Sequence, residues 1–269
     1  MRHASAHPGD VFARHRIDPH RPGAPARIAA QLREHGLVTV TGLASRTDVL
    51  ALASRIMTVT EHRDSDSDGI TTIRDTGHHA HRAGFAGFGH GALDPHTERS
   101  GIPCPPRLML LVCGQVAQAG GECVLVDGRA VHADLTAVSH EAVTALAQPR
   151  SAYFGAGDGH PSQVFTAHAD HTIAMRLRLD GLARFSPIVQ PYLPQLRAAV
   201  TRHKATVRLE PGQGYLLDNR RWLHARTAFT GDRVCWRALG QPRFPMPDGF
   251  TPDPVSALQR LPSIAGAER

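Results

Sequence analysis

The sequence lacks the features that mark several common protein classes. Its 269 residues include only four cysteines, without Cys-x-x-Cys spacing, too few for a disulfide framework. The longest strongly apolar run, residues 108–113, is far too short to cross a bilayer. The N-terminus is polar and basic and lacks the apolar core of a secretory signal. These absences predict a globular, cytoplasmic protein with no membrane partner.

Lysine and aromatic side chains are also scarce. Lys204 is the only lysine, which argues against Schiff-base chemistry and leaves no GxxxxGK[ST] phosphate loop. No GxSxG nucleophile elbow is present. The formal net charge is +6, but the arginines are scattered and aromatic residues make up only 5%. The charge pattern therefore argues against nucleic acid as the main partner.

Histidine, by contrast, is abundant. The chain has 18 histidines within an otherwise ordinary globular composition that is 41% hydrophobic. Imidazole is a common metal ligand and a proton carrier near neutral pH. The histidine content therefore directs the search for a functional site toward metals.

The apolar patterns predict many short strands and a few helices in one domain over residues 1–269. Apolar residues at helical spacing predict helices at residues 28–35, 47–57, 130–135, 141–146 and 189–203. Short apolar or alternating segments predict strands at 36–42, 70–74, 108–113, 123–126, 173–179, 205–209, 214–217 and 234–239. Irregular composition predicts an N-terminal arm at 1–26, an active-site loop at 76–95 and a C-terminal tail at 242–269. This pattern favours a mainly β barrel or sandwich with helices around it.

Three His-x-Asp/Glu tripeptides are candidates for a mononuclear iron site, which needs two histidines and one carboxylate. His132-Ala-Asp134 lies in a predicted helix, where residues two apart do not face each other. His168-Ala-Asp170 precedes a strand and remains possible on position alone. His96-Thr-Glu98 follows the Gly-rich loop and precedes the strand at 108–113, and this context favours it.

The residues around His96 and His224 carry a family resemblance. His96-Thr-Glu98, residues 105–111 (PPRLMLL), residues 120–127 (GGECVLVD) and residues 209–229 (LEPGQGYLLDNRRWLHARTAF) resemble the taurine dioxygenase superfamily of iron(II)/2-oxoglutarate oxygenases. Glutamate in the first motif is similar to the clavaminate synthase and amino-acid β-hydroxylase branch. The resemblance implies a double-stranded β-helix (jelly roll, clavaminate synthase-like) core flanked by helices. It also implies that His96, Glu98 and His224 hold Fe(II), with 2-oxoglutarate and O2 as co-substrates.

The same resemblance suggests the co-substrate and substrate residues. The family places arginines after the second histidine, and Arg233 and Arg237 reproduce their four-residue spacing. We expect Arg233 to bind the distal carboxylate of 2-oxoglutarate, because its planar guanidinium can donate two parallel hydrogen bonds. Cys123 stands where the family often has threonine or serine, and a thiol is a weaker donor. Arg237, Arg226 and His90 are candidate substrate-binding residues, and His78, His79 and His81 lie in the same predicted loop.

The resemblance implies oxidation of an unactivated C–H bond, with release of succinate and CO2. Hydroxylation is the simplest outcome; desaturation and cyclisation are alternatives. The substrate is expected to be a small polar molecule, such as a free or carrier-bound amino acid, in specialised metabolism. Two other classes stay open: a catalytically inactive barrel that binds small molecules or polyanions, and a zinc hydrolase using the same ligands. The sequence does not indicate an oligomeric state.

Overall fold

The computed structural model of the chain describes residues 8–77 and 84–253. The predicted tail from residue 254, the first seven residues of the predicted arm, and His78, His79 and His81 lie outside the described residues. Within the described ranges, no helix is both long enough and apolar enough to cross a membrane.

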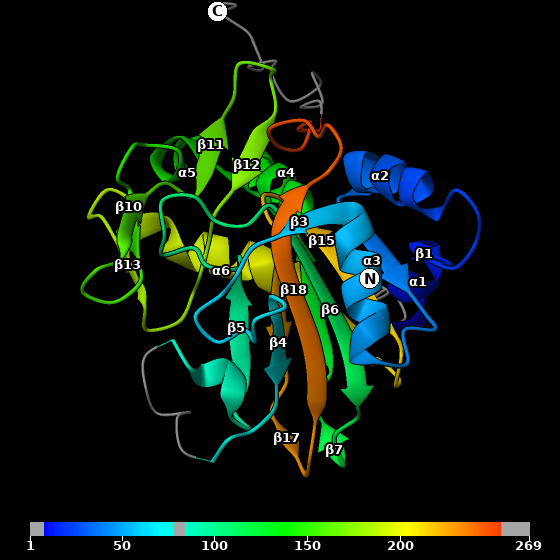
Figure 1. The fold of residues 1–269 in the computed structure, drawn as a ribbon. Coiled ribbons are helices and arrows are strands. Elements are labelled where there is room, and N and C mark those ends of the chain that lie inside the picture. Colours follow the sequence, from blue (N-terminus) through cyan, green and yellow to red (C-terminus); the bar gives the residue numbers. More distant parts are fainter. Residues whose placement is uncertain (1–7, 78–83, 254–269) are drawn as a thin grey trace, which may run out of the picture.

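Two β-sheets form the centre of the molecule (Figure 1). The larger sheet runs in the order β1 (Arg16–Ile17), β2 (Leu37–Val40), β15 (Gly214–Asp218), β6 (Leu108–Gln115), β18 (Val234–Pro242) and β3 (Met57–Val59). Strand β4 (Ile70–Ile73) is also paired with β18. The smaller sheet runs in the order β14 (Lys204–Val207), β8 (Cys123–Asp127), β16 (Trp222–Arg226) and β5 (Leu93–His96). The pairing within the smaller sheet is antiparallel throughout.

The alternation of side chains along β6 shows how the larger sheet separates two cores. Met109, Leu111 and Cys113 point to an inner core shared with β8, β14 and β16 of the smaller sheet. The intervening residues of the same strand belong to an outer core that packs against helices. Because successive side chains of a strand face opposite sides, one apolar run fills both cores.

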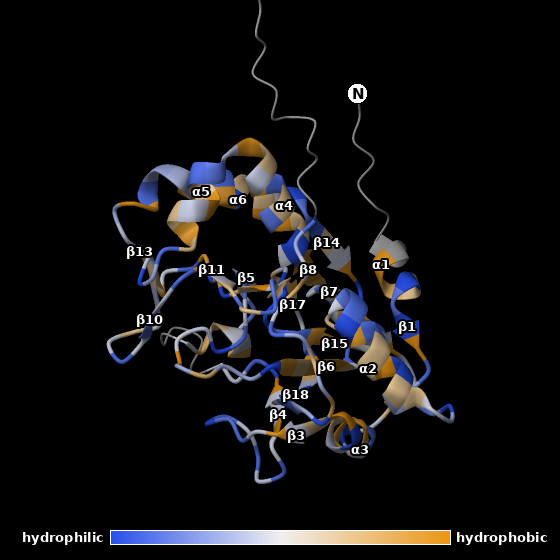
Figure 2. Ribbon diagram, turned by 90° about the horizontal axis from the view of Figure 1, so that it is seen from above, coloured by the Kyte–Doolittle hydropathy of each residue, from blue (hydrophilic) through white to orange (hydrophobic). Residues whose placement is uncertain are grey.

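Helices cover the outer face of each sheet (Figure 2). Helices α2 (Ala24–His35) and α3 (Arg46–Ile56) pack on the larger sheet. Helices α4 (Gly128–Val138), α5 (His140–Leu146) and α6 (Leu193–Arg202) pack on the smaller sheet. This arrangement of two facing sheets flanked by helices confirms the predicted mainly β, jelly-roll architecture.

Three predicted segments differ from the structure. Much of the predicted N-terminal arm is ordered, because α1 (Pro8–Arg14), β1 and the start of α2 fall within it. The strand predicted over 173–179 is shorter, since β12 (Ile173–Met175) ends at Met175 and the chain then turns to meet residue 97. The helix predicted over 189–203 begins with the 3-10 turn Gln190–Tyr192 and continues as α6, with a proline in the first turn of each.

The remaining elements are short and lie at the ends of the two sheets. They comprise the 3-10 turn Ala86–Phe88 and the strands β7 (Ala119–Gly120), β9 (Ala152–Phe154), β10 (His160–Ser162), β11 (Phe165–Ala167), β13 (Ala183–Phe185) and β17 (Phe229–Thr230). Strand β17 pairs with β7 beside the connection to β18. After β18, residues 243–253 form no helix or strand, as predicted for the start of the tail.

Candidate metal centre

His96 and His224 are directly opposite each other on neighbouring strands. His96 ends β5, and its Cα partner on β16 is His224. Their ring centroids lie 4.3 Å apart. Leu223 packs under the helices that cover the smaller sheet, and Trp222 packs in the inner core, so alternation turns His224 inward, between the two sheets. Strand pairing therefore brings together two histidines that are 128 positions apart in the sequence (224 minus 96).

Glu98 completes the group two residues after β5. It is 6% exposed, and its backbone is fixed by Asn219 in the turn between β15 and β16. Asn219 is itself placed by a hydrogen bond from its backbone N–H to the carbonyl of Arg107, and Arg107 forms a buried bidentate ion pair with Asp218. A rigid turn thus holds the carboxylate beside the two histidines.

The three side chains have the spacing of a metal site. One potential ligand atom from each of His96, Glu98 and His224 lies within 4.8 Å of the others. In the described part of the chain, these residues form the one such group of three or more His, Cys, Asp or Glu side chains. Nε2 of His224 is buried without a hydrogen-bond partner among the described residues, 3.6 Å from Oε2 of Glu98. An unsatisfied nitrogen that faces a carboxylate is suited to binding a cation.

The hydrogen bonding of His96 also suits a metal ligand. Its Nδ1 lies 2.7 Å from the carbonyl oxygen of Asp94 and donates to it, which leaves Nε2 with a free lone pair. A backbone carbonyl that fixes one ring nitrogen is the usual way in which a protein orients a metal-binding imidazole.

The charges of the group match the protonation states that a metal requires. Burial raises the pKa of the Glu98 carboxyl, but the charges of Arg237, His224 and His96 outweigh it and hold this pKa at about 2. Burial, and after it the neighbouring His96 ring, lower the pKa of His224 to about 3. Near neutral pH the carboxylate is therefore ionised and His224 is neutral, as metal binding demands.

Arg237 on β18 lies next to the carboxylate. Its Nη1 donates to Oε2 of Glu98 at 2.9 Å, and its Nε is buried without a partner among the described residues. His62, in the loop after β3, lies close enough that the charges of Arg237 and Glu98 affect its titration. Burial, and then the charge of Arg237, lower the pKa of His62 to about 4. Arg237 is thus a direct neighbour of the candidate ligands, whereas Nδ1 of His62 is partnered with Asp64.

A second pocket surrounds Arg233, which is 7% exposed. Nη2 of Arg233 lies 3.8 Å from the sulfur of Cys123, and no described aspartate or glutamate forms an ion pair with it. At Gly121, where φ is +77°, an added Cβ would lie 3.0 Å from Cδ of Arg233. Glycine there permits both the turn and the close approach of the arginine.

The surroundings of Arg233 are weakly polar and carry no charge that neutralises it. Cys113 and Cys235 are direct cross-strand partners on β6 and β18 and are buried with Cys123 as free thiols. The hydroxyl of Tyr215 is buried beside the weakly polar Cys123 thiol and has no nitrogen or oxygen partner among the described residues. A buried cation and a free hydroxyl, both lacking strong partners, fit the carboxylate of a small molecule.

The structure gives Arg226 and His90 partners other than a substrate. The guanidinium of Arg226 donates to the carbonyls of Gly87, Gly89 and Gly91. The His90 ring pairs with Asp75 and packs edge-on against Phe229. Substrate contact was expected for both residues because of their position near the site. The observed partners connect both residues to the predicted active-site loop, and contact with a substrate stays a prediction for both.

The other two His-x-acid tripeptides do not form comparable groups. His132 lies in α4, as predicted, and packs against Phe165. Asp170 caps a turn by accepting hydrogen bonds from Thr172. Neither tripeptide belongs to a group with metal-ligand spacing within the described ranges. The sequence context that favoured His96 and Glu98 therefore agrees with the geometry.

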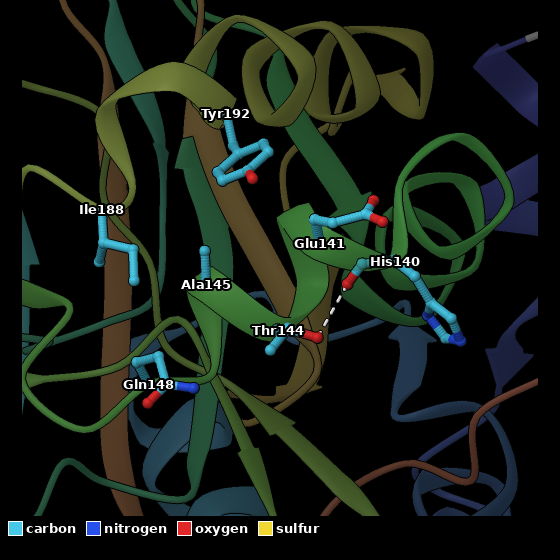
Figure 3. A pocket seen from close by; sticks show the side chains of 7 residues that line it. All are labelled: His140, Glu141, Thr144, Ala145, Gln148, Ile188 and Tyr192. Atoms are coloured by element: carbon cyan, nitrogen blue, oxygen red, sulfur yellow. Dashed lines mark hydrogen bonds between the residues drawn. The ribbon is translucent and has the colours of Figure 1, made fainter.

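A separate surface cavity of about 350 Å³ lies outside the sheets. It is bordered by α5 and by the segment that ends in the 3-10 turn at Tyr192, and it is lined by His140, Glu141, Thr144, Ala145, Gln148, Ile188 and Tyr192 (Figure 3). Thr144 donates to the carbonyl of His140 within the helix. No pair of these side chains is arranged for catalysis.

Comparison with known proteins places the chain in one family. The family described as "Taurine catabolism dioxygenase TauD, TfdA family" matches residues 7–239, which is most of the sequence. No curated protein matches the chain at a significant level.

Solved structures with the same fold include an asparagine oxygenase and a non-haem iron oxygenase. An asparagine oxygenase in complex with Fe(II), 2S,3S-3-hydroxyasparagine and succinate is 19% identical, with a TM-score of 0.68 over 81% of this chain and 79% of that one. The non-haem iron oxygenase OrfP, in complex with Fe and alpha-ketoglutaric acid, is 15% identical, with a TM-score of 0.65 over 81% and 80% of the two chains. At these identities the likeness establishes the fold.

Proposed function

The chain belongs to the TauD, TfdA family of iron(II)- and 2-oxoglutarate-dependent dioxygenases, and we propose that it hydroxylates an unactivated C–H bond of a small amino-acid-derived substrate. The observation that carries the proposal is the group of His96, Glu98 and His224, with potential ligand atoms within 4.8 Å of one another. Two histidines and one carboxylate with open positions are the ligand set of non-haem iron oxygenases.

We assign His96, Glu98 and His224 as the iron ligands. Iron(II) bound with 2-oxoglutarate supplies oxidation by O2, which releases succinate and CO2. The protein prepares the ligands for this role. The carbonyl of Asp94 orients the His96 ring, and Asn219 fixes the backbone of Glu98. Burial keeps His224 neutral, so its Nε2 lone pair is available.

We assign Arg233 as the anchor of the distal carboxylate of 2-oxoglutarate, with Cys123 beside it. Support comes from the buried guanidinium, which has no carboxylate partner among the described side chains. An ionised carboxylate there would form charge-assisted hydrogen bonds in a pocket from which water is largely excluded. The free hydroxyl of Tyr215 is a further donor. It compensates for the weak donor strength of the Cys123 thiol.

Arg237 is our candidate for contact with the substrate. It is held at Glu98, so a substrate carboxylate bound to Arg237 would sit next to the iron ligands. His62 is a second candidate, because the charges of Arg237 and Glu98 both affect its pKa. One solved neighbour contains hydroxylated asparagine, and the other contains iron with alpha-ketoglutaric acid. The hydroxylated asparagine supports an amino acid as the substrate class. Hydroxylation is therefore favoured over desaturation and cyclisation.

Family membership favours an oxygenase over an inactive binding barrel or a zinc hydrolase. We also propose that the chain acts as a single oxygenase domain, because the family match spans nearly all strands of both sheets. A cytoplasmic location is proposed as well. It is supported by the four cysteines, which are all free thiols, as expected in a reducing compartment.

The test is amino-acid-dependent release of succinate. The protein is incubated with Fe(II), 2-oxoglutarate and O2, and single amino acids are screened for stimulated succinate formation. Loss of turnover is expected in His96→Ala and in His224→Ala. The matched control is His168→Ala, which removes the histidine of an unrelated His-x-Asp tripeptide and should retain turnover. Retained activity in His96→Ala or His224→Ala would contradict the assigned ligands.

A further inference from the structure

Arg226 projects from the same strand and the same side as His224. The two residues are two positions apart on β16, so their side chains share the face between the sheets. The Cα partner of Arg226 on β5 is Leu93, three residues before His96. Arg226 is 5% exposed. It is therefore a buried cation beside the candidate metal centre, with a role still to be explained.

Among the described residues, all the hydrogen-bond partners of this guanidinium are backbone carbonyls. Nη2 donates to the carbonyls of Gly89 at 2.6 Å and Gly91 at 2.5 Å, and Nη1 donates to that of Gly87 at 3.2 Å. Nε is buried without a partner among the described residues. One side chain thus gathers three carbonyls of the segment that leads into β5. We call residues 87–91 the docked segment.

The docked segment is also joined to β17. The backbone N–H of Phe229 donates to the His90 carbonyl at 3.0 Å, and the His90 ring lies 4.7 Å from the Phe229 ring. Phe229 contacts Arg226 as well, because that guanidinium lies 4.7 Å from its ring centroid. The segment, Arg226 and Phe229 therefore form one continuous contact.

Arg233 lies on the other side of this contact. Its guanidinium is 5.9 Å from the centroid of the same Phe229 ring. Neither arginine forms an ion pair with a described carboxylate. Both guanidiniums lie over the same Phe229 ring, with no carboxylate of the described residues between them. Two buried cations around one aromatic ring repel each other until an anion lies between or beside them.

We propose that Arg226 is a positioning residue that couples the binding of the 2-oxoglutarate carboxylate at Arg233 to the docked segment. The inference rests on the proposed role of Arg233. An anion at Arg233 offsets the repulsion that acts on Arg226 and so strengthens the hold of Arg226 on the three carbonyls. Because coupling between two equilibria is reciprocal, a firmly docked segment also raises the affinity for 2-oxoglutarate.

The coupling orders the assembly of the site. The docked segment runs directly into β5, which carries His96. Binding of 2-oxoglutarate would therefore fix the segment next to the candidate metal centre before the substrate arrives. The substrate then binds to a site in which the docked segment is already fixed by the co-substrate. Binding energy is thus used stepwise to organise the site.

Hydrogen–deuterium exchange of the full chain tests the coupling. Exchange is measured anaerobically with Fe(II), with and without 2-oxoglutarate, for peptides that cover residues 84–92 and Phe229. We expect 2-oxoglutarate to slow exchange in both peptides by about 5-fold or more, a modest allosteric coupling. Binding of 2-oxoglutarate is followed in the same samples by its visible absorption with Fe(II).

Two substitutions separate charge from hydrogen bonding. Arg226→Gln should raise exchange of residues 84–92, remove their response to 2-oxoglutarate and weaken 2-oxoglutarate binding by a similar factor. Arg226→Lys keeps the charge but cannot donate to three carbonyls at once. It should raise basal exchange yet retain part of the response.

The matched control is Arg176→Gln, because Arg176 donates to the carbonyls of Ile102 and Pro103. This control should leave the response of residues 84–92 unchanged.

The outcomes distinguish this inference from the proposed function. If 2-oxoglutarate binds the wild type but exchange of residues 84–92 and Phe229 does not change, the coupling is wrong and the assignment of Arg233 survives. A full wild-type response in Arg226→Gln would likewise overturn the coupling. If 2-oxoglutarate does not bind the wild type, the proposed function fails and the coupling fails with it. The wild-type comparison decides the matter even if Arg226→Gln does not fold.

Discussion

The side chain of Asn219 is hydrogen-bonded to both backbone groups of Glu98. Its Oδ1 accepts from the Glu98 N–H at 2.6 Å, and its Nδ2 donates to the Glu98 carbonyl at 2.9 Å. The same Nδ2 donates to the carbonyl of Pro106 at 2.8 Å. All of these bonds are buried, so a turn in the middle of the C-terminal half fixes the backbone of the proposed carboxylate ligand. Asn219 therefore acts as a positioning residue.

Replacing Asn219 should weaken iron binding without removing any ligand. Asn219→Ala leaves buried backbone groups without partners, which costs about 1–3 kcal/mol of unfolding free energy. Loss of outer-shell support typically lowers metal affinity roughly 10–100-fold. Anaerobic Fe(II) titration by calorimetry measures this change. Asn219→Asp keeps the acceptor for the Glu98 N–H but loses the donors, so its effect should be intermediate. Unchanged Fe(II) affinity in Asn219→Ala would contradict the positioning role.

Substitution of Arg233 should act on the co-substrate and spare the metal. Arg233→Gln removes the buried cation, and loss of a charge-assisted bidentate contact of about 3 kcal/mol corresponds to a roughly 100-fold rise in the Kd for 2-oxoglutarate. The control is Arg208→Gln. Arg208 lines the mouth of the same pocket but is largely exposed and paired with Glu210. A comparable loss in both variants would show that general positive charge, and not the anchor, binds the co-substrate.

Replacing the weak donor at Cys123 with a stronger one should tighten the binding of 2-oxoglutarate, opposite to the effect expected for Arg233→Gln. Cys123→Ser replaces the buried thiol with a hydroxyl of similar size, which is a stronger donor to a carboxylate. We expect the Kd for 2-oxoglutarate to fall by about 3–10-fold, the equivalent of one neutral hydrogen bond of roughly 1 kcal/mol. Calorimetric titration with 2-oxoglutarate in the presence of Fe(II) measures it. Weaker binding in Cys123→Ser would indicate that the thiol does not face the carboxylate.

His15 should make the stability of the fold depend on pH. Burial, then the charges of His35, Arg14 and Arg221, lower its pKa to about 4, against 6.5 for an ordinary histidine. The unfolded chain therefore binds the additional proton between pH 6.5 and 4, so this contribution to stability is complete above pH 6.5 and is lost as the pH falls to 4. The loss should be about 1–3 kcal/mol.

Urea unfolding at a series of pH values tests the role of His15. Other histidines also titrate in this range, so the comparison is between the wild type and His15→Gln. The wild type should lose more unfolding free energy than the variant as the pH falls from 6.5 to 4. Parallel curves for the two proteins would mean that His15 does not contribute.

Much of the fold was predictable because the two sheets follow simple apolar patterns. The strand predicted over 108–113 is the start of β6, and its alternate residues fill the two cores. Strand β5 was missed, since its four residues include an aspartate and a proline and lack apolar alternation. It forms because β16 pairs with it, a tertiary interaction that local propensity does not contain.

The sequence identified only those site residues whose type and motif indicate their role. His96, Glu98 and His224 stand in recognisable motifs, and the structure brings them together. The roles of Asn219, Tyr215 and His62 depend on partners far away in the sequence, so no local signal identified them. Arg226 was expected to face the substrate. Its hydrogen bonds to glycine carbonyls could not be predicted, because those glycines carry no side chain that would reveal a contact.

Anaerobic titration of the metal-free protein with Fe(II) and 2-oxoglutarate tests the central claim most directly. The claim predicts a weak visible charge-transfer band with a stoichiometry near one. The band should be lost in Glu98→Ala, which removes a proposed ligand, and much weakened in Arg233→Ala. It should persist in Asp170→Ala, which alters the unrelated His168-Ala-Asp170 tripeptide. A folded wild-type protein without the band, or a Glu98→Ala variant that retains it at full strength, would contradict the account.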